Sequence, residues 1–127
     1  MRRVFVVAAL LFTGAGASSA DDAATRFDFM LNCSGCHGTD ASGSVTVPAL
    51  DETATLVATR EGRDYLIRVP GVAQAPLSDE RLARLMNFVV SEFGRSPEFE
   101  PFTTAEVTRL RADPLRSPLS ARPSLFP

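Results

Sequence analysis

Five consecutive residues, Cys33-Ser34-Gly35-Cys36-His37, limit the fold and chemistry of this chain more than any other part of its sequence. They include both cysteines of the 127 residues and the single histidine. Two thiols three positions apart lie on the same side of a helical turn, and the next residue brings an imidazole beneath them. This spacing is typical of covalent haem attachment. Two thioethers then hold the haem, and the histidine binds its iron as the proximal axial ligand.

Other uses of this segment explain less of it. A disulfide between Cys33 and Cys36 leaves His37 without a role. A thioredoxin-like redox pair belongs in a βαβ context, but the chain has no alternating strand pattern of useful length. A zinc site needs a fourth ligand, and the sequence contains no other Cys or His. We therefore expect one covalently bound haem c.

The N-terminal residues 1–20 are typical of a secretory signal peptide. Two arginines precede a run of nine apolar residues, and small residues lead up to Ala20, as the cleavage rule requires. A membrane anchor is the alternative, but the apolar run is much shorter than the roughly 20 residues that cross a bilayer. We expect cleavage after Ala20 and a mature periplasmic chain without a stable membrane span.

The composition indicates a packed acidic protein. Hydrophobic residues make up 45% of the chain, and 13 cations, all of them arginine, face 15 acids for a formal net charge of -2. Cleavage after Ala20 removes two of the arginines and no acid, so the mature chain is more acidic still. Nucleic-acid-binding proteins of the usual kind are basic. We therefore expect no nucleic-acid partner.

Two segments beyond the haem motif follow a known pattern. A Gly- and Ser-rich loop runs from Gly38 to the segment 47–50, and residues 77–90 have the periodicity of an amphipathic helix. Together with the pentapeptide, these segments resemble the class I monohaem cytochromes c of the bacterial periplasm over about residues 23–93.

The resemblance implies a fold and several contacts. It implies that the carbonyl of Pro48 accepts a hydrogen bond from His37. It also implies that Phe88 packs against the helix that carries the haem motif. The fold is expected to be all-α, with three to five short helices around one covalent haem. The expected divisions are a signal peptide over 1–20, a cytochrome c domain over 21–94 and a C-terminal extension with a short helix and a Pro-rich tail over 95–127.

Apolar periodicity and capping residues indicate where the helices lie. Phe27, Met30 and Leu31 have i, i+3, i+4 spacing, which predicts the core face of a helix from Asp21 to about Cys33. Two further helices are predicted over 53–60 and 63–69, and Pro70-Gly71 ends the second of them. Ser78 and Thr103 are each expected to cap the start of a later helix. The last ten residues are expected to be loose.

The resemblance places the sixth iron ligand in residues 69–76, and this segment contains no methionine. Val69 or Val72 stands where the family has that ligand. Gln74 is the only side chain of the segment with a plausible donor atom, and it is a weak ligand. Met86 is the second weak candidate, although its helical spacing predicts core packing. The sixth ligand is left unassigned.

Three further side chains have open roles in the sequence. Met30 lies one turn before the motif and is expected in the core. Tyr65 could bind iron as a phenolate, although packing or a contact with a haem propionate is commoner. Arg68 precedes the 69–76 segment and could stabilise a bound anion, although an exposed structural arginine is commoner.

Two functions of different class follow from these residues. The first is electron transfer by a periplasmic carrier, or by the haem partner of a dehydrogenase or oxidase, without enzymatic activity of its own. The alternative is an open iron site that binds a small gas or peroxide, with weak peroxidase-type activity. A domain that holds haem only for structure is a third option.

Overall fold

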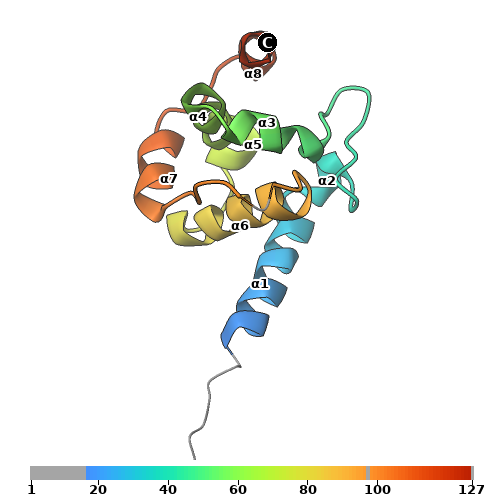
Figure 1. The fold of residues 1–127 in the computed structure, drawn as a ribbon, viewed down its shortest axis with the longest axis vertical. Helices are drawn as coiled ribbons and strands as arrows, with labels where there is room; N and C mark the ends of the chain where they lie inside the picture. Colours follow the sequence, from blue (N-terminus) through green and yellow to red (C-terminus); the bar gives the residue numbers. More distant parts are fainter. Residues whose placement is uncertain (1–16, 97, 127) are drawn as a thin grey trace, which may run out of the picture.

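The computed structural model describes residues 17–96 and 98–126, which form an all-helical fold without strands (Figure 1). The predicted all-α class is confirmed. Residues 1–16 of the predicted signal peptide lie outside the described residues. The helices are α1 (Ala17–Asn32), α2 (Ser34–His37), α3 (Thr53–Val57), α4 (Arg60–Arg68), α5 (Pro70–Ala73), α6 (Asp79–Glu92), α7 (Thr104–Arg111) and α8 (Pro118–Ala121), with the 3-10 turns η1 (Leu50–Glu52) and η2 (Arg122–Leu125).

The described α-helices outnumber the expected three to five because several are single turns. α2, α5 and α8 have four residues each. The longer elements surround one hydrophobic core, and α1 extends away from it at the end opposite α8 (Figure 1). None of the helices in the described ranges is both long enough and apolar enough to cross a membrane.

The predicted core face of α1 is wrong. Phe27, Met30 and Leu31 are 61%, 48% and 66% exposed, whereas the neighbouring stripe that includes Asp28 and Phe29 is buried. Apolar periodicity in the sequence favours the stripe of Phe27, Met30 and Leu31, because a carboxylate such as that of Asp28 is rarely buried without a partner. The chain is already helical at Ala17, before the expected start at Asp21, since the small residues 17–20 continue the helix.

Aromatic contacts join the end of α1 to α6. The ring of Phe29 lies 4.7 Å from that of Phe93 and 6.2 Å from that of Phe88, between centroids. Phe88 and Phe93 pack edge to face at 5.7 Å. The expected contact of Phe88 with the motif-bearing helix is therefore present, and Phe93 makes a closer one.

An ion pair explains how Asp28 is buried in the same contact. Arg81 of α6 donates to both of its carboxylate oxygens, with Nη2–Oδ1 at 2.5 Å and Nε–Oδ2 at 3.2 Å. The Asp28 side chain is 5% exposed, and that of Arg81 is 49% exposed. A bidentate guanidinium–carboxylate pair is geometrically specific and fixes α1 against α6.

Loss of this guanidinium is expected to destabilise the haem-loaded protein. Arg81→Ala leaves the buried Asp28 carboxylate without its charged partner and should lower the free energy of unfolding by about 2 kcal/mol. Arg84→Ala is the matched control on the same helix, since its pair with Glu80 is solvent-exposed. It should cost no more than about 0.5 kcal/mol. Urea unfolding measures both, and equal losses would contradict this role for the buried pair.

Two of the predicted helix caps are confirmed. The Ser78 side chain accepts a hydrogen bond from the backbone N–H of Arg81, and the Thr103 side chain accepts one from the N–H of Glu106. The carboxylate of Glu106 turns instead to the guanidinium of Arg63, with Nη2–Oε2 at 2.7 Å and Nε–Oε1 at 3.0 Å. Thr103 therefore caps α7, and Glu106 ties that helix to α4.

The C-terminal extension is built into the core. Phe102, Val107 and Leu110 are at most 4% exposed and belong to the hydrophobic cluster of α1, α3, α4 and α6. The side chain of Asn87 in α6 bonds both backbone groups of Phe102, with Nδ2–O at 3.1 Å and N–Oδ1 at 2.7 Å. The start of the extension is thereby paired with α6.

Residues 118–126 are more ordered than predicted. α8 and η2 replace the expected loose end, and Leu125 and Phe126 pack against the core cluster. Pro118 and Pro123 stand in the first turn of these two elements, where a missing N–H costs no hydrogen bond. Prolines that indicate a loose tail in the sequence therefore begin short helices in the structure.

Candidate haem site

The two cysteines lie where α1 passes into α2. The backbone N–H of Cys33 still bonds Phe29 O at 2.9 Å, and the N–H groups of Cys36 and His37 bond Cys33 O at 3.2 and 3.0 Å. Both thiols are free, with Cys33 half-buried and Cys36 exposed. One tight turn thus carries two thiols and the imidazole that follows them.

The environment of the two thiols differs. Burial raises the pKa of the Cys33 thiol to about 11, and the nearby charges of Asp28 and Cys36 contribute to the same rise in pKa. The unattached Cys33 is therefore a neutral thiol at pH 7, whereas thiolates are the reactive form of cysteine.

The imidazole of His37 is held by the loop that follows it. Its Nδ1 lies 2.9 Å from the carbonyl oxygen of Pro48. A carbonyl oxygen only accepts, so Nδ1 carries the proton and Nε2 keeps its lone pair. An imidazole fixed in this tautomer is suited to bind a metal through Nε2.

The loop reaches Pro48 through a tight turn at Gly43. The N–H of Gly43 bonds His37 O at 2.8 Å, and that of Leu50 bonds Ala41 O at 3.0 Å. Gly43 has φ +71°, in the left-handed region, and a Cβ there would lie 2.7 Å from the carbonyl carbon of Pro48. Glycine at this position lets the loop fold back onto the histidine.

Gly43→Ala is therefore expected to destabilise the haem-loaded protein. Left-handed backbone costs an L-residue about 1–2 kcal/mol, and the close backbone adds steric strain. Gly35→Ala is the control within the motif, since a Cβ there meets nothing within 4 Å. Gly35 is helical, so its replacement should be neutral or slightly stabilising. Thermal unfolding compares the two variants, and an unchanged midpoint in Gly43→Ala would contradict this account.

The residues around the turn fit a covalently bound haem. The two thiols stand on one turn, and the imidazole that follows them keeps one nitrogen available for iron. The fit rests on the donors themselves and on the contact between His37 and Pro48. Haem bound here would be attached through Cys33 and Cys36 and ligated by His37.

The segment 69–76 runs beside the attachment helix. Pro70 ends α4 as predicted, but it also begins the single turn α5. Pro70, Gly71 and Gln74 line a shallow hollow of about 280 Å³ together with Asn32, the last residue of α1. Gln74 is exposed, so its side chain is available to this hollow.

The other candidate ligands lie in different surroundings. Met86 is 4% exposed and belongs to the hydrophobic core, whereas Met30 is 48% exposed on α1. Tyr65 is half-buried against the core, and burial raises its pKa. Arg68 is engaged by the C-terminal extension, with its Nη2 2.7 Å from the Asp113 carboxylate.

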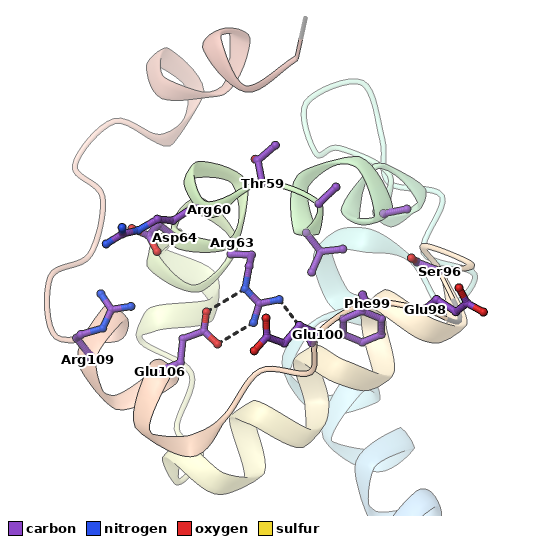
Figure 2. Close-up of a pocket in the computed structure, with 13 residues that line it drawn as sticks. Thr59, Arg60, Arg63, Asp64, Ser96, Glu98, Phe99, Glu100, Glu106 and Arg109 are labelled. Atoms are coloured by element: carbon purple, nitrogen blue, oxygen red, sulfur yellow. Dashed lines mark hydrogen bonds and ion pairs between the residues drawn. The ribbon is translucent and has the colours of Figure 1, made fainter.

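A larger cavity of about 580 Å³ lies between α3, α4, α7, Ser96 and residues 98–100, and its described lining includes none of the motif residues (Figure 2). Arg63 points into it toward Glu106 and donates to Glu100 O at 2.6 Å. The Arg63 guanidinium also stacks 4.2 Å over the Phe102 ring. No local pattern in the sequence indicates this role of Arg63, because its partners Glu100 and Glu106 lie about 40 residues further along the chain.

Comparison with known proteins identifies related chains, although no family model matches this one. A protein named Cytochrome c-552 from Thermus thermophilus is 30% identical over 133 aligned positions, which cover 87% of this chain and 87% of that protein. A second Thermus thermophilus protein of the same name is 31% identical over 106 positions, covering 65% of this chain and 81% of that protein.

The resemblance seen in the sequence, the all-helical fold and these relatives agree with one another. The alignment with the first relative covers most of both chains. Electron transfer through haem c is the shared function, and the prediction of a covalent haem cofactor is confirmed at the level of the family. The chain belongs to the c-type cytochromes.

Proposed function

We propose that this c-type cytochrome is an exported electron carrier whose haem is bound by Cys33, Cys36 and His37. The hydrogen bond between His37 Nδ1 and Pro48 O carries the proposal. It fixes the tautomer in which Nε2 is available to iron, and it joins the motif to the loop that resembles that of class I cytochromes c.

The protein residues prepare the site for electron transfer. When bound, haem c supplies a one-electron redox centre. His37 is oriented by Pro48, so its ring position stays constant as the charge at the centre changes. Helices α1 and α6 are joined by an aromatic cluster and the buried Asp28–Arg81 pair, which keep the turn that carries both thiols in place. A site that barely rearranges suits electron transfer.

The proposed location is the periplasm, and the proposed partner is a dehydrogenase or an oxidase. The signal-like residues 1–20 support export, and the excess of acids over arginines favours a partner with a basic docking surface. No enzymatic activity of the chain itself is proposed.

A spectroscopic titration tests the proposal. The mature protein, made with a haem-maturation system, should gain the mass of one haem and take up one electron per haem. It should return to the oxidised spectrum with an equimolar one-electron oxidant. A Cys33–Cys36 disulfide without haem in that system would contradict the site. Rapid turnover of peroxide by the loaded protein would contradict the role as a simple carrier.

The sixth iron position supports a second candidate function. Segment 69–76 offers no sulfur, imidazole or amine, and Met86 is enclosed by core residues. We propose that this position is open or weakly held by water or Gln74. An open position would let the protein bind a small gas or peroxide.

A further inference from the structure

Arg111, the last residue of α7, reaches across to residues 73–79, which run from the end of segment 69–76 to the start of α6. Its Nε donates to Ala73 O at 2.9 Å, and its Nη2 donates to Ala75 O at 2.7 Å. Its Nη1 donates to Leu77 O at 2.8 Å and to the Asp79 carboxylate at 2.9 Å. One guanidinium thus bonds three alternate carbonyls of this segment and the first residue of α6.

This contact is largely shielded from water. The Arg111 side chain is 16% exposed, and that of Asp79 is 31% exposed. Hydrogen bonds from a charged donor are stronger than neutral ones, and low exposure limits competition from solvent. Only the planar fork of arginine can donate in all these directions, so a lysine would keep the charge but lose most of the bonds.

A second contact holds the other end of the same segment. Arg68, which directly precedes Val69, donates through Nε to Asp113 O at 2.8 Å and through Nη2 to the Asp113 carboxylate at 2.7 Å. The backbone N–H of Leu115 donates to Arg68 O at 2.8 Å. Residues 111–115 therefore contact the chain at Arg68, just before segment 69–76, and again over residues 73–79.

We propose that residues 111–115 form a strap that fixes segment 69–76 on the sixth-ligand side of the haem, with Arg111 as the positioning residue. The inference rests on the proposed assignment of that segment to the sixth position. The strap holds the backbone around Gln74 in place, so that access to the sixth position of a bound haem would depend on an element outside the 21–94 region.

Hydrogen exchange of the haem-loaded protein tests the strap. Arg111→Gln removes the charge and most of the donors, so backbone amides in 69–77 should exchange about tenfold faster. Amides in the C-terminal half of α6, away from the Arg111–Asp79 contact, should be unaffected. Arg109→Gln is the matched control, because Arg109 is exposed on the same helix. In this variant the amides in 69–77 should exchange at the wild-type rate. Arg111→Lys, which retains the charge, keeps the test available if Arg111→Gln fails to fold, and it should also speed exchange in 69–77.

Carbon monoxide binding is the second readout. In Arg111→Gln the reduced protein should bind carbon monoxide about tenfold faster than the wild type, because the loosened segment opens more often. Wild-type exchange rates in 69–77 would overturn the strap, as would uniformly faster exchange along the whole chain. If the wild type does not bind carbon monoxide, the open sixth position is wrong. Faster exchange confined to 69–77 would then still support the strap.

Discussion

His37→Ala is expected to abolish the stable haem-loaded protein. The variant loses the proposed axial ligand, and it also loses the hydrogen bond by which His37 holds Pro48. The haem contributes folding free energy only when its ligands are present, so the yield of haem-loaded protein should fall at least about tenfold. The visible spectrum and the intact mass of the purified protein measure this yield.

Ser34→Ala is the matched control for that experiment. Ser34 lies between the two cysteines, and its hydroxyl donates only to Met30 O at 2.8 Å among the described residues. The control should lose about 1 kcal/mol or less and keep the wild-type spectrum. A His37→Ala protein with normal yield and an unchanged spectrum would show that another side chain binds the iron.

The reduced wild type is expected to bind carbon monoxide rapidly and almost completely at neutral pH. An iron with five strong ligands leaves its sixth position available, whereas a strongly bound sixth ligand must first be displaced. Val69→Met or Val72→Met should make the spectrum low-spin. It should also raise the reduction potential on the order of 0.1 V, since a thioether favours the reduced iron. Optical spectra with and without carbon monoxide, together with a redox titration, provide the measurement.

Met86→Leu separates an open position from ligation by the core methionine. Met86 is 4% exposed among apolar neighbours, and leucine conserves its volume. The substitution should cost under about 1.5 kcal/mol and leave the haem spectrum unchanged. Loss of a sulfur-to-iron band in this variant would identify Met86 as the ligand. A wild type that ignores carbon monoxide would likewise refute the open position.

The parts of the protein that could be predicted are those encoded locally. The haem motif lies within five residues, and the caps at Ser78 and Thr103 depend on backbone groups three positions away. All-α content follows from periodicity alone. These features need no knowledge of what lies elsewhere in the fold.

The parts that could not be predicted depend on partners distant in the sequence. Apolar spacing predicts that Phe27, Met30 and Leu31 lie in the core. That prediction is wrong because no residue close to Asp28 in the sequence indicates that Arg81 pairs with its carboxylate. The hydrogen bonds of Arg111 could not be predicted for a related reason. Its partners are mostly backbone carbonyls, which every residue carries, so the sequence contains no signature of them.

The joining of α1 to α6 sets an order of events while the chain is synthesised. Asp28 meets Arg81, which lies 53 positions later in the chain. A chain that emerges N-terminus first therefore presents Cys33 and Cys36 before the helix that covers their neighbours exists. At synthesis rates of about 5–20 residues per second, the delay lasts several seconds. During this interval both thiols lie on a segment that α6 has not yet covered.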